Sequence, residues 1–445
     1  MSKQKKKGLV PDLRFPEFRE HEGWATFKLI DVADKNVKWS FIGGPFGSNL
    51  KSSDYVEKGI RIIQLQNIGD AKFKDGYKIF TSKEKADELL ANNIYPGDII
   101  LSKMGDPVGR ACLIPDTHQR YVMCSDGIRL VVDEKSHSKY FIYSLINDSK
   151  FRSSIEETAT GSTRKRIGLD ELKKLPMYLP VKTEQQQIAD CLSSIDDLIS
   201  VQYQKLDALK THKKVLMQQL FPAEGETVPK LRFSKFRKCW VEIKLIDTAD
   251  RSIKWSFIGG PFGSNLKSSD YVEEGIRIIQ LQNIGDEKFK NKYKIFTSKE
   301  KADELLANNI YPNDIIISKM GDPVGRACFI PNDHQRYVMC SDGIRLVVDE
   351  KIYDKYFIFS LINDKRFRSS IEASATGSTR KRIGLNDLKN LSMLVPELKE
   401  QKKISDCLSS IDEVITVKNQ KIETLKLHKK GLMQQLFPVI NEVTA

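Results

Sequence analysis

Two long stretches of the chain place apolar residues alternately four and three positions apart. The first runs from Glu184 to Leu220, and the second repeats it 216 residues later. This heptad spacing predicts two coiled-coil helices, whose apolar residues face a partner helix. Two core positions of each helix are polar, Gln202 and Lys213 in the first and Lys418 and Lys429 in the second, and matched polar positions can fix the register of pairing.

The helix pair has one alternative, in which each helix packs its apolar stripe on its own domain. Five heptads without a break favour pairing. The residues predicted to form the helix-pair and partner interface are Ile188, Leu192, Ile195, Ile199, Leu206, Leu209, Leu216, Leu220, Ile404, Leu408, Ile411, Ile415, Ile422, Leu425, Leu432 and Leu436.

Ahead of the first helix, the pattern changes to mixed strand, turn and helix signals. Residues Gly59–Ile68 indicate a strand, and Tyr95–Pro115 a hairpin with its turn at Gly105. Residues Ser125–Asp133 alternate apolar and polar positions, which indicates a strand with one buried face. Residues Ser138–Glu157 indicate one helix. Its expected core residues are Phe141, Leu145, Phe151 and Ile155. These signals predict an α/β (α+β) globular domain.

The whole pattern occurs twice. Residues Ile42–Glu57 recur unchanged at Ile258–Glu273, and the same shift aligns Trp24–Pro222 with Trp240–Pro438 without a gap. Of the 199 aligned pairs 46 differ, so about 77 per cent are identical. Each copy is large enough to fold as a unit. The stretch Phe221–Pro229, rich in Pro, Gly and Glu, indicates a linker between the copies.

This organisation predicts two near-identical globular domains separated by two long antiparallel helices. A helix over 184–220 would be about 55 Å long and would carry the chain from one domain to the next. The second helix can pack on the first only by running back, which gives a pseudo-two-fold repeat, the symmetry of a palindrome reader. The expected parts are an N-terminal segment 1–23, domain one 24–180, spacer helix one 181–222, a linker 223–239, domain two 240–396, spacer helix two 397–438 and a tail 439–445.

A formal charge of +13 and a pI of about 9.1 suit a polyanionic partner. Residues Ala159–Leu169 recur at Ala375–Leu385 and carry three consecutive cations among small residues, so this loop can approach phosphates closely. Cations flank the predicted hairpin tip, and neighbouring amides are of the kind that read adenine edges. The alternatives are a solvated basic loop, glycines that only serve turns, and amides that satisfy a sheet edge. The candidate DNA-binding residues are Lys51, Gln64, Gln66, Asn67, Lys103, Arg110, Arg164, Lys165, Arg166, Lys267, Gln280, Gln282, Asn283, Lys319, Arg326, Arg380, Lys381 and Arg382.

No catalytic or metal-binding residue is predicted. The sequence lacks the phosphate loop GxxxxGKS/T and the Asn-Pro-Pro-aromatic tetrapeptide of amino-methyltransferases. Seven cysteines without a CxxC pair indicate small buried thiols, and the six histidines have no metal-ligand spacing. Asp126 ahead of Asp133, Glu134 and Lys135 is a loose nuclease-like set, for which the alternative is a turn after a strand. No apolar run reaches membrane-spanning length, so a cytoplasmic protein of a bacterial or archaeal cell is expected.

Two such domains, each followed by a heptad helix bearing EQQQIADCLSSIDDLI or its counterpart and ending in LMQQLFP, resemble the specificity (S) subunit of a type I restriction–modification system. The resemblance implies two target recognition domains that each read half of a bipartite site in double-stranded DNA. It implies that the helices act as a ruler and as the docking surface for two modification subunits. Restriction subunits would join for translocation and cleavage. S-adenosylmethionine, ATP and magnesium would then belong to partner subunits, and none to this chain.

The near-identity of the two domains departs from that family, whose recognition domains usually differ strongly. It predicts a palindromic target in place of an asymmetric one. The alternatives are a stand-alone DNA-binding repressor or architectural protein, and a self-contained nuclease.

Overall fold

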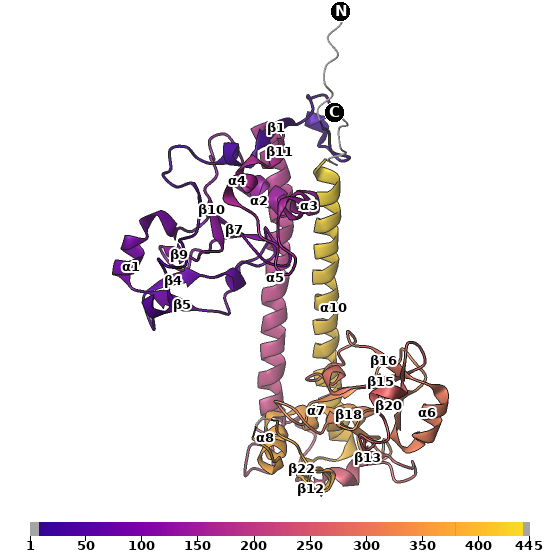
Figure 1. Cartoon of the computed structure of the whole chain (residues 1–445). Coiled ribbons are helices and arrows are strands. Elements are labelled where there is room, and N and C mark those ends of the chain that lie inside the picture. The colour runs from indigo at the N-terminus through magenta and orange to yellow at the C-terminus, as the bar shows by residue number, and fades with distance from the viewer. Residues whose placement is uncertain (1–8, 379, 439–445) are drawn as a thin grey trace, which may run out of the picture. The chain divides into compact units, whose positions relative to one another are not determined.

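The computed structural model describes residues 9–378 and 380–438, so the tail 439–445 and the first eight residues of the N-terminal segment lie outside it. The chain forms two compact units, whose boundaries lie between Tyr203 and Gln204 and between Asn419 and Gln420. Each unit holds one globular domain, the first part of one long helix and the last part of the other (Figure 1). In the described part of the chain, no helix combines the length and apolarity that crossing a membrane needs.

Each globular domain contains three small sheets. In domain one the strand orders are β3-β5-β4-β9-β6, β2-β10-β7-β8 and β1-β11. The strands are β1 (Ala25–Lys28), β2 (Phe41–Gly43), β3 (Tyr55–Val56), β4 (Ile60–Ile63), β5 (Ile79–Thr81), β6 (Asn93–Ile94), β7 (Ile99–Ser102), β8 (Ala111–Leu113), β9 (Tyr121–Met123), β10 (Gly127–Leu130) and β11 (Pro176–Leu179). The helices are α1 (Lys83–Glu88), α2 (Lys139–Ile146), α3 (Ser149–Thr158) and α4 (Leu169–Lys174).

Domain two repeats this topology. Its strands are β12 (Val241–Lys244), β13 (Phe257–Gly259), β14 (Tyr271–Val272), β15 (Ile276–Ile279), β16 (Ile295–Thr297), β17 (Asn309–Ile310), β18 (Ile315–Ser318), β19 (Ala327–Phe329), β20 (Tyr337–Met339), β21 (Gly343–Leu346) and β22 (Ser392–Val395). Its helices are α6 (Lys299–Glu304), α7 (Lys355–Asn363), α8 (Lys365–Ser374) and α9 (Leu385–Lys389).

The predicted hairpin is confirmed, because β7 and β8 pair antiparallel and enclose the loop 103–110. The strand predicted over Gly59–Ile68 is shorter and ends at Ile63. A three-residue 3-10 turn, Leu65–Asn67, follows it, because Asn67 Oδ1 accepts the backbone N–H of Gln64 at 2.9 Å and closes the turn.

The strand predicted over Ser125–Asp133 is also shorter, since β10 ends at Leu130. The expected alternation is only partly right. The apolar residues are buried, but Arg129 between them is buried too, because its Nε donates to Asp98 at 2.7 Å.

The single helix predicted over Ser138–Glu157 is wrong, because the segment forms two helices, α2 and α3. The first helix ends at Ile146, and Asp148 caps the second, because its side chain accepts the backbone N–H of Lys150 at 3.0 Å. The four expected core residues are all buried.

The two long helices are α5 (Lys182–Leu220) and α10 (Leu398–Leu436), each of 39 residues. In the first unit, Ile188 and Leu192 near the start of α5 share a core with Leu436 and Phe437 at the end of α10, so the two helices run antiparallel there. The same core contains Trp24 of domain one. Pairing between helices and packing on the domain therefore coexist at the helix ends, although the sequence patterns set them apart as alternatives.

The second unit is built in the same way from the end of α5 and the start of α10. Phe221 is only 1 % exposed and packs against Trp240 and Phe357, with ring centroids 6.4 and 5.6 Å away. The linker therefore begins after Phe221 and not at it. The expectation of buried thiols is right for Cys112, Cys124 and Cys328 only. Cys239, in the linker, is exposed, and the other three cysteines are partly buried.

Candidate nucleic-acid interface

Loops from five parts of each domain meet at one face, which we call the candidate interface. In domain one it comprises residues 44–52, 64–67, 103–110, 124–126 and 159–167. Gly44 joins the first loop to the start of β10, directly after the fourth loop, since its N–H donates to the carbonyl of Gly127 at 2.8 Å. A Cβ at Gly44 would lie 1.8 Å from the carbonyl oxygen of Cys124, so only glycine permits this approach.

The loop with three consecutive cations is held against the hairpin loop by backbone hydrogen bonds. The N–H of Gly105 donates to the carbonyl of Lys165 at 3.1 Å, and that of Ile167 donates to Lys103 at 3.0 Å. The backbones of Arg166 and Thr160 pair across the loop: the N–H of Arg166 donates to the carbonyl of Thr160 at 2.8 Å, and the N–H of Thr160 donates to the carbonyl of Arg166 at 2.9 Å. The loop therefore has a fixed shape at its base, while the three cationic side chains are exposed. Domain two repeats these bonds.

The cations gather densely enough to affect one another. Burial and the nearby positive charge of Arg382 lower the pKa of Lys319. Arg166 and Arg382 each face one carboxylate, Asp126 and Asp342, at 3.8 and 3.7 Å. These pairs are long and half-exposed, so they leave the guanidinium groups able to bind another anion.

The remaining predicted cations lie around the same loops. Lys51 and Lys267 are exposed, each just before a short 3-10 turn. Lys103 and Arg110 flank the hairpin loop and are half-buried. Arg326 is the counterpart of Arg110, and the Nε atoms of both are buried without a hydrogen-bond partner in the described part of the chain.

Only part of the predicted amide set faces solvent. Gln66 is exposed, and Gln64 is half-buried and donates to the Tyr55 hydroxyl at 3.1 Å. Asn67 is fully buried and its Nδ2 donates to the carbonyls of Lys74 and Tyr77, both at 2.8 Å. Asn283 is buried in the same way. The prediction that these two asparagines contact DNA is therefore dropped, and their role is to shape the turn.

A hollow of about 270 Å³ lies in the candidate interface of domain two. Gln280, Gln282, Ser341 and Asp342 contribute polar groups to its lining, beside Phe262. Phe262 and its counterpart Phe46 are each 82 % exposed. Neither residue was among the DNA-binding candidates predicted from the sequence. The available signal was an aromatic residue inside a Gly- and Ser-rich turn, where no core pattern includes it.

The acidic residues of the loose nuclease-like set have separate partners. Asp133 Oδ1 accepts the N–H of Lys135 at 3.1 Å, and Glu134 pairs with Lys139 at 2.6 Å. Asp126 faces Arg166. Asp133 and Lys135 therefore form the turn after a strand that the sequence offered as the alternative to a nuclease-like set. Within residues 9–378 and 380–438, no group of three or more His, Cys, Asp or Glu residues could hold a metal ion.

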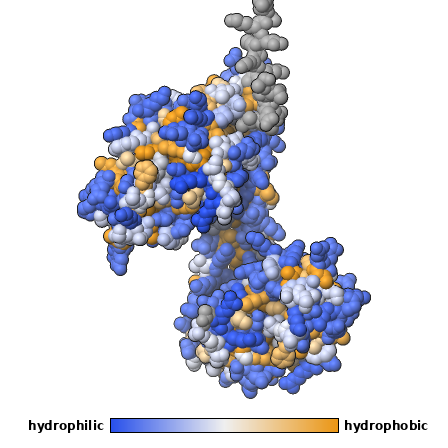
Figure 2. All heavy atoms as spheres, viewed as in Figure 1, coloured by the Kyte–Doolittle hydropathy of each residue, from blue (hydrophilic) through white to orange (hydrophobic). Residues whose placement is uncertain are grey.

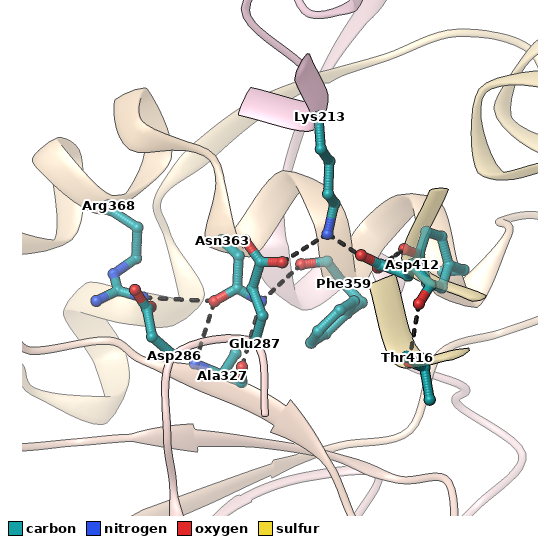
Figure 3. Close-up of polar contacts among 10 residues, drawn as sticks. Lys213, Asp286, Glu287, Ala327, Phe359, Asn363, Arg368, Asp412 and Thr416 are labelled. Carbon is teal, nitrogen blue, oxygen red and sulfur yellow. Dashed lines mark hydrogen bonds and ion pairs between the residues drawn. The ribbon is translucent and has the colours of Figure 1, made fainter. Parts of the chain in front are cut away.

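A second feature attaches each domain to the long helices. In the second unit, Lys213 of α5 donates to Asp412 of α10 at 2.9 Å and to Glu287 of domain two at 2.6 Å (Figure 3). Tyr356 of α7 also donates to Asp412. Burial opposes the charge on Lys213, but the two carboxylates outweigh it and raise its pKa. The polar heptad position therefore binds helix to helix and helix to domain.

The first unit has the same arrangement with one carboxylate fewer. Lys429 donates to Asp196 at 2.6 Å, and Tyr140 donates to the same carboxylate. The counterpart of Glu287 is Ala71, whose carbonyl accepts the Tyr143 hydroxyl at 2.6 Å. Lys429 therefore relies on Asp196 for its counter-charge.

This asymmetry gives a stability prediction. Asp196→Ala should lower the free energy of unfolding of the first unit by about 1–3 kcal/mol, because it leaves Lys429, only 16 % exposed, without a carboxylate. Asp412→Ala should cost the second unit less, because Glu287 still pairs with Lys213. Hydrogen exchange of each domain's amides in increasing urea measures the two units separately.

The control is the double variant Asp412→Ala with Glu287→Ala. It should lower the free energy of unfolding of the second unit by as much as Asp196→Ala lowers that of the first unit. Equal losses from the two single variants would mean that Glu287 contributes nothing to this attachment.

The substitutions between the copies avoid the candidate interface. Residues 40–57, 59–70, 102–112, 118–135 and 159–169 have no difference from their counterparts 216 positions later. The two domains therefore present the same side chains on the same loops. Over the face in view, the surface of each unit is mostly hydrophilic, with scattered apolar residues (Figure 2).

Comparison with known proteins places these features in context. A sequence model described as the type I restriction modification DNA specificity domain matches residues 21–211 and 276–427. The chain is 25 % identical over 369 residues to the type I restriction enzyme MjaVIII specificity subunit of Methanocaldococcus jannaschii, covering 79 % of this chain and 80 % of that protein. It is 24 % identical to the StySPI specificity subunit of Salmonella potsdam, covering 86 % and 81 %.

The fold also has a solved counterpart. The crystal structure of a type I restriction–modification S subunit from M. genitalium aligns with 97 % of this chain and 100 % of that chain. The TM-score is 0.53 and the sequence identity 16 %. At this identity the likeness concerns the fold alone.

Proposed function

Because the chain belongs to the type I restriction modification DNA specificity family, we propose that each of its two domains reads one half of a bipartite DNA site through the candidate interface. The chain is the DNA-specificity subunit of such a system and is not itself an enzyme. The observation that carries the proposal is the gathering of exposed cations, amides and an aromatic side chain on one face, with the same residues in both copies.

The chemistry of this face suits duplex DNA. The exposed cations on loop 159–167 neutralise phosphates and position the domain without reading sequence. The amides of Gln64 and Gln66 can read adenine edges, and the carboxylate of Asp126 can accept from the cytosine amino group. Bases are thus read next to the loops that hold the backbone.

The helices offer a surface for the modification subunits. Leu198 and Val201 of α5 are 52 % and 41 % exposed, and their counterparts on α10, Val414 and Val417, are 45 % and 60 % exposed. Each unit thus presents an apolar pair at the same two positions of a helix surface, Leu and Val in the first unit and two Val in the second, which supports docking of two modification subunits. In this proposal, S-adenosylmethionine, ATP and magnesium bind to partner subunits.

Co-expression with modification subunits tests this function. The chain should copurify with them, and methylation-aware sequencing of the host genome should show one methylated motif that disappears when the chain is omitted. A stand-alone repressor or architectural protein would bind DNA without these subunits and leave the methylation unchanged. Magnesium-dependent cutting by the pure chain would support the nuclease alternative instead.

The length of the helices should set the gap between the half-sites. Seven residues inserted in register at Tyr203/Gln204 and at Asn419/Gln420 keep the contacts inside each unit, because both unit boundaries lie there. Each insertion adds about 10.5 Å of helix, so the gap in the methylated motif should grow by roughly three base pairs. Sequencing of the methylated genome measures the gap.

The half-site bases should stay the same in this variant. A motif whose half-sites change while its gap does not would contradict the ruler. Insertion of seven residues into the linker 223–229, outside both helices, is the matched control and should leave the gap unchanged.

A further inference from the structure

We propose that Phe46 and Phe262 are wedge residues, each of which inserts between two adjacent base pairs of its half-site. The inference rests on the proposed function and assigns these aromatic side chains a role in it. Apolar side chains that enter a base step partly unstack it and kink the duplex.

Both phenylalanine side chains project almost completely into solvent. At 82 %, Phe46 and Phe262 are the most exposed large hydrophobic side chains in the described part of the chain. Exposure of this size contributes nothing to the core of either domain. The same residue stands at the same loop position in both copies, so the placement occurs twice in one structure.

Hydrogen bonds and a close backbone contact fix the loop that carries each ring. Gly44 fixes the start of the loop against Cys124, as described above. The carbonyl of Phe46 accepts the N–H of Asn49 at 2.8 Å, which closes a turn directly after the ring, and Phe262 repeats this bond to Asn265 at 2.8 Å. A wedge needs such support, because a side chain on a loose loop loses more entropy on insertion.

Open space surrounds the glycine that follows each phenylalanine, Gly47 and Gly263. A Cβ built at Gly47 or at Gly263 meets no atom within 4 Å, and neither residue has a left-handed φ. The fold itself therefore does not require glycine at these positions. A missing side chain next to an inserted ring leaves room for the sugar–phosphate backbone.

The surroundings indicate DNA rather than a protein partner. Phe262 borders the hollow lined by Gln280, Gln282 and Asp342, and Asp342 faces Arg382. Gln66 and Gln282 have no side-chain hydrogen bond to any described residue, so their amides are available for base edges. The core of a protein–protein interface is depleted of charged residues, whereas a base step is flanked by phosphates and polar edges.

The wedge has a consequence for the target sequence. Pyrimidine–purine steps unstack at least cost, so each half-site should contain such a step at the point of insertion. The selected step would add specificity beyond the hydrogen bonds to bases.

Fluorescence of 2-aminopurine, which rises when the base loses its stacking, tests the proposal in the assembled modification complex. The probe is placed in turn at each position of a half-site found by methylation sequencing. The wild-type complex should raise the signal at one step per half-site. The double variant Phe46→Ala with Phe262→Ala should abolish this rise and weaken specific binding at least tenfold. The double variant Phe46→Leu with Phe262→Leu should retain part of the fluorescence rise and part of the specific binding affinity.

Two controls isolate the effect. Leu90→Ala with Leu306→Ala removes side chains that are 53 % and 51 % exposed and lie outside the lining of the hollow, so it should change neither signal nor affinity. A base flipped by the modification subunits for methylation would give its own signal, which the Phe46→Ala/Phe262→Ala variant should keep once DNA is saturated.

Three results would overturn the wedge. One is unchanged affinity and an unchanged probe signal in the alanine variant. Another is a wild-type complex that raises no signal except at the base flipped for methylation. The third is loss of the modification subunits from the alanine variant on gel filtration, which would make the phenylalanines protein-docking residues. Failure of the proposed function is a different result, in which the wild-type complex binds no particular sequence.

Discussion

DNA binding is expected to weaken, and its salt dependence to flatten, when alanine replaces Arg164, Lys165 and Arg166 and their three counterparts in domain two. All six side chains are exposed on loops held at the base by backbone hydrogen bonds. Each phosphate contact contributes about 0.9 to the slope of log affinity against log salt concentration, so losing six should reduce the slope by about five. Titrations of the assembled complex at several salt concentrations measure it.

A charge-preserving variant is the matched control. Arg164→Lys with Arg166→Lys, and the same changes at Arg380 and Arg382, should keep most of the slope, because counterion release depends on charge. The loss should also be uniform across DNA sequences, because phosphate contacts carry no base information. A slope unchanged by the alanine substitutions would mean that these loops do not meet the DNA backbone.

The methylated motif is expected to be an inverted repeat, a short half-site followed by a fixed gap and its reverse complement. The five loop segments of the candidate interface are identical in the two domains, so both should read the same bases. A wrong base pair in a recognition site typically costs about 1–3 kcal/mol. Changing a base in either half-site should therefore cost the same binding free energy, measured by competition with the unchanged site.

A domain swap provides the second measurement. A chain with residues 24–180 in place of 240–396, assembled with the modification subunits, should direct methylation to the same motif as the original chain. The pairs that differ, such as Gly97 and Asn313, support this expectation, because both adopt the left-handed backbone of a turn. A motif with unrelated halves would show that the few differing side chains decide base identity.

Long-range periodicity and turn chemistry explain what could be predicted from the sequence. The heptad spacing predicted the ends of both long helices to within a few residues, because a paired helix must keep one apolar stripe buried over many turns. The hairpin over Tyr95–Pro115 was predicted because two apolar runs flank a Gly-Asp-Pro turn. The break at Asp148 was missed, although Asn-Asp-Ser is a helix-capping signal, because the apolar spacing continues across it.

The candidate interface was beyond sequence patterns for two physical reasons. Its loops are joined by backbone hydrogen bonds such as Gly105 to Lys165, and backbone groups are the same in every residue. Asn67 was misassigned as a DNA contact because a short amide can bond to its own turn as readily as to a base. Phe46 was missed because a functional apolar residue outside any periodic pattern resembles an incidental one.

The sharing of helix ends between domains affects the order in which the two units can be completed during synthesis. The first unit needs Phe437 to complete its core, but the domain part of that core has been synthesised once the ribosome reaches Leu192. The ribosome must therefore add more than 200 further residues before the unit can close. At 5–20 residues per second this takes roughly 12–49 s. The second unit does not wait, because its borrowed residue Phe221 is synthesised before its domain. During the delay the open first domain can accept an LMQQLFP segment of another chain, so exchange of this element between chains competes with closure within one chain.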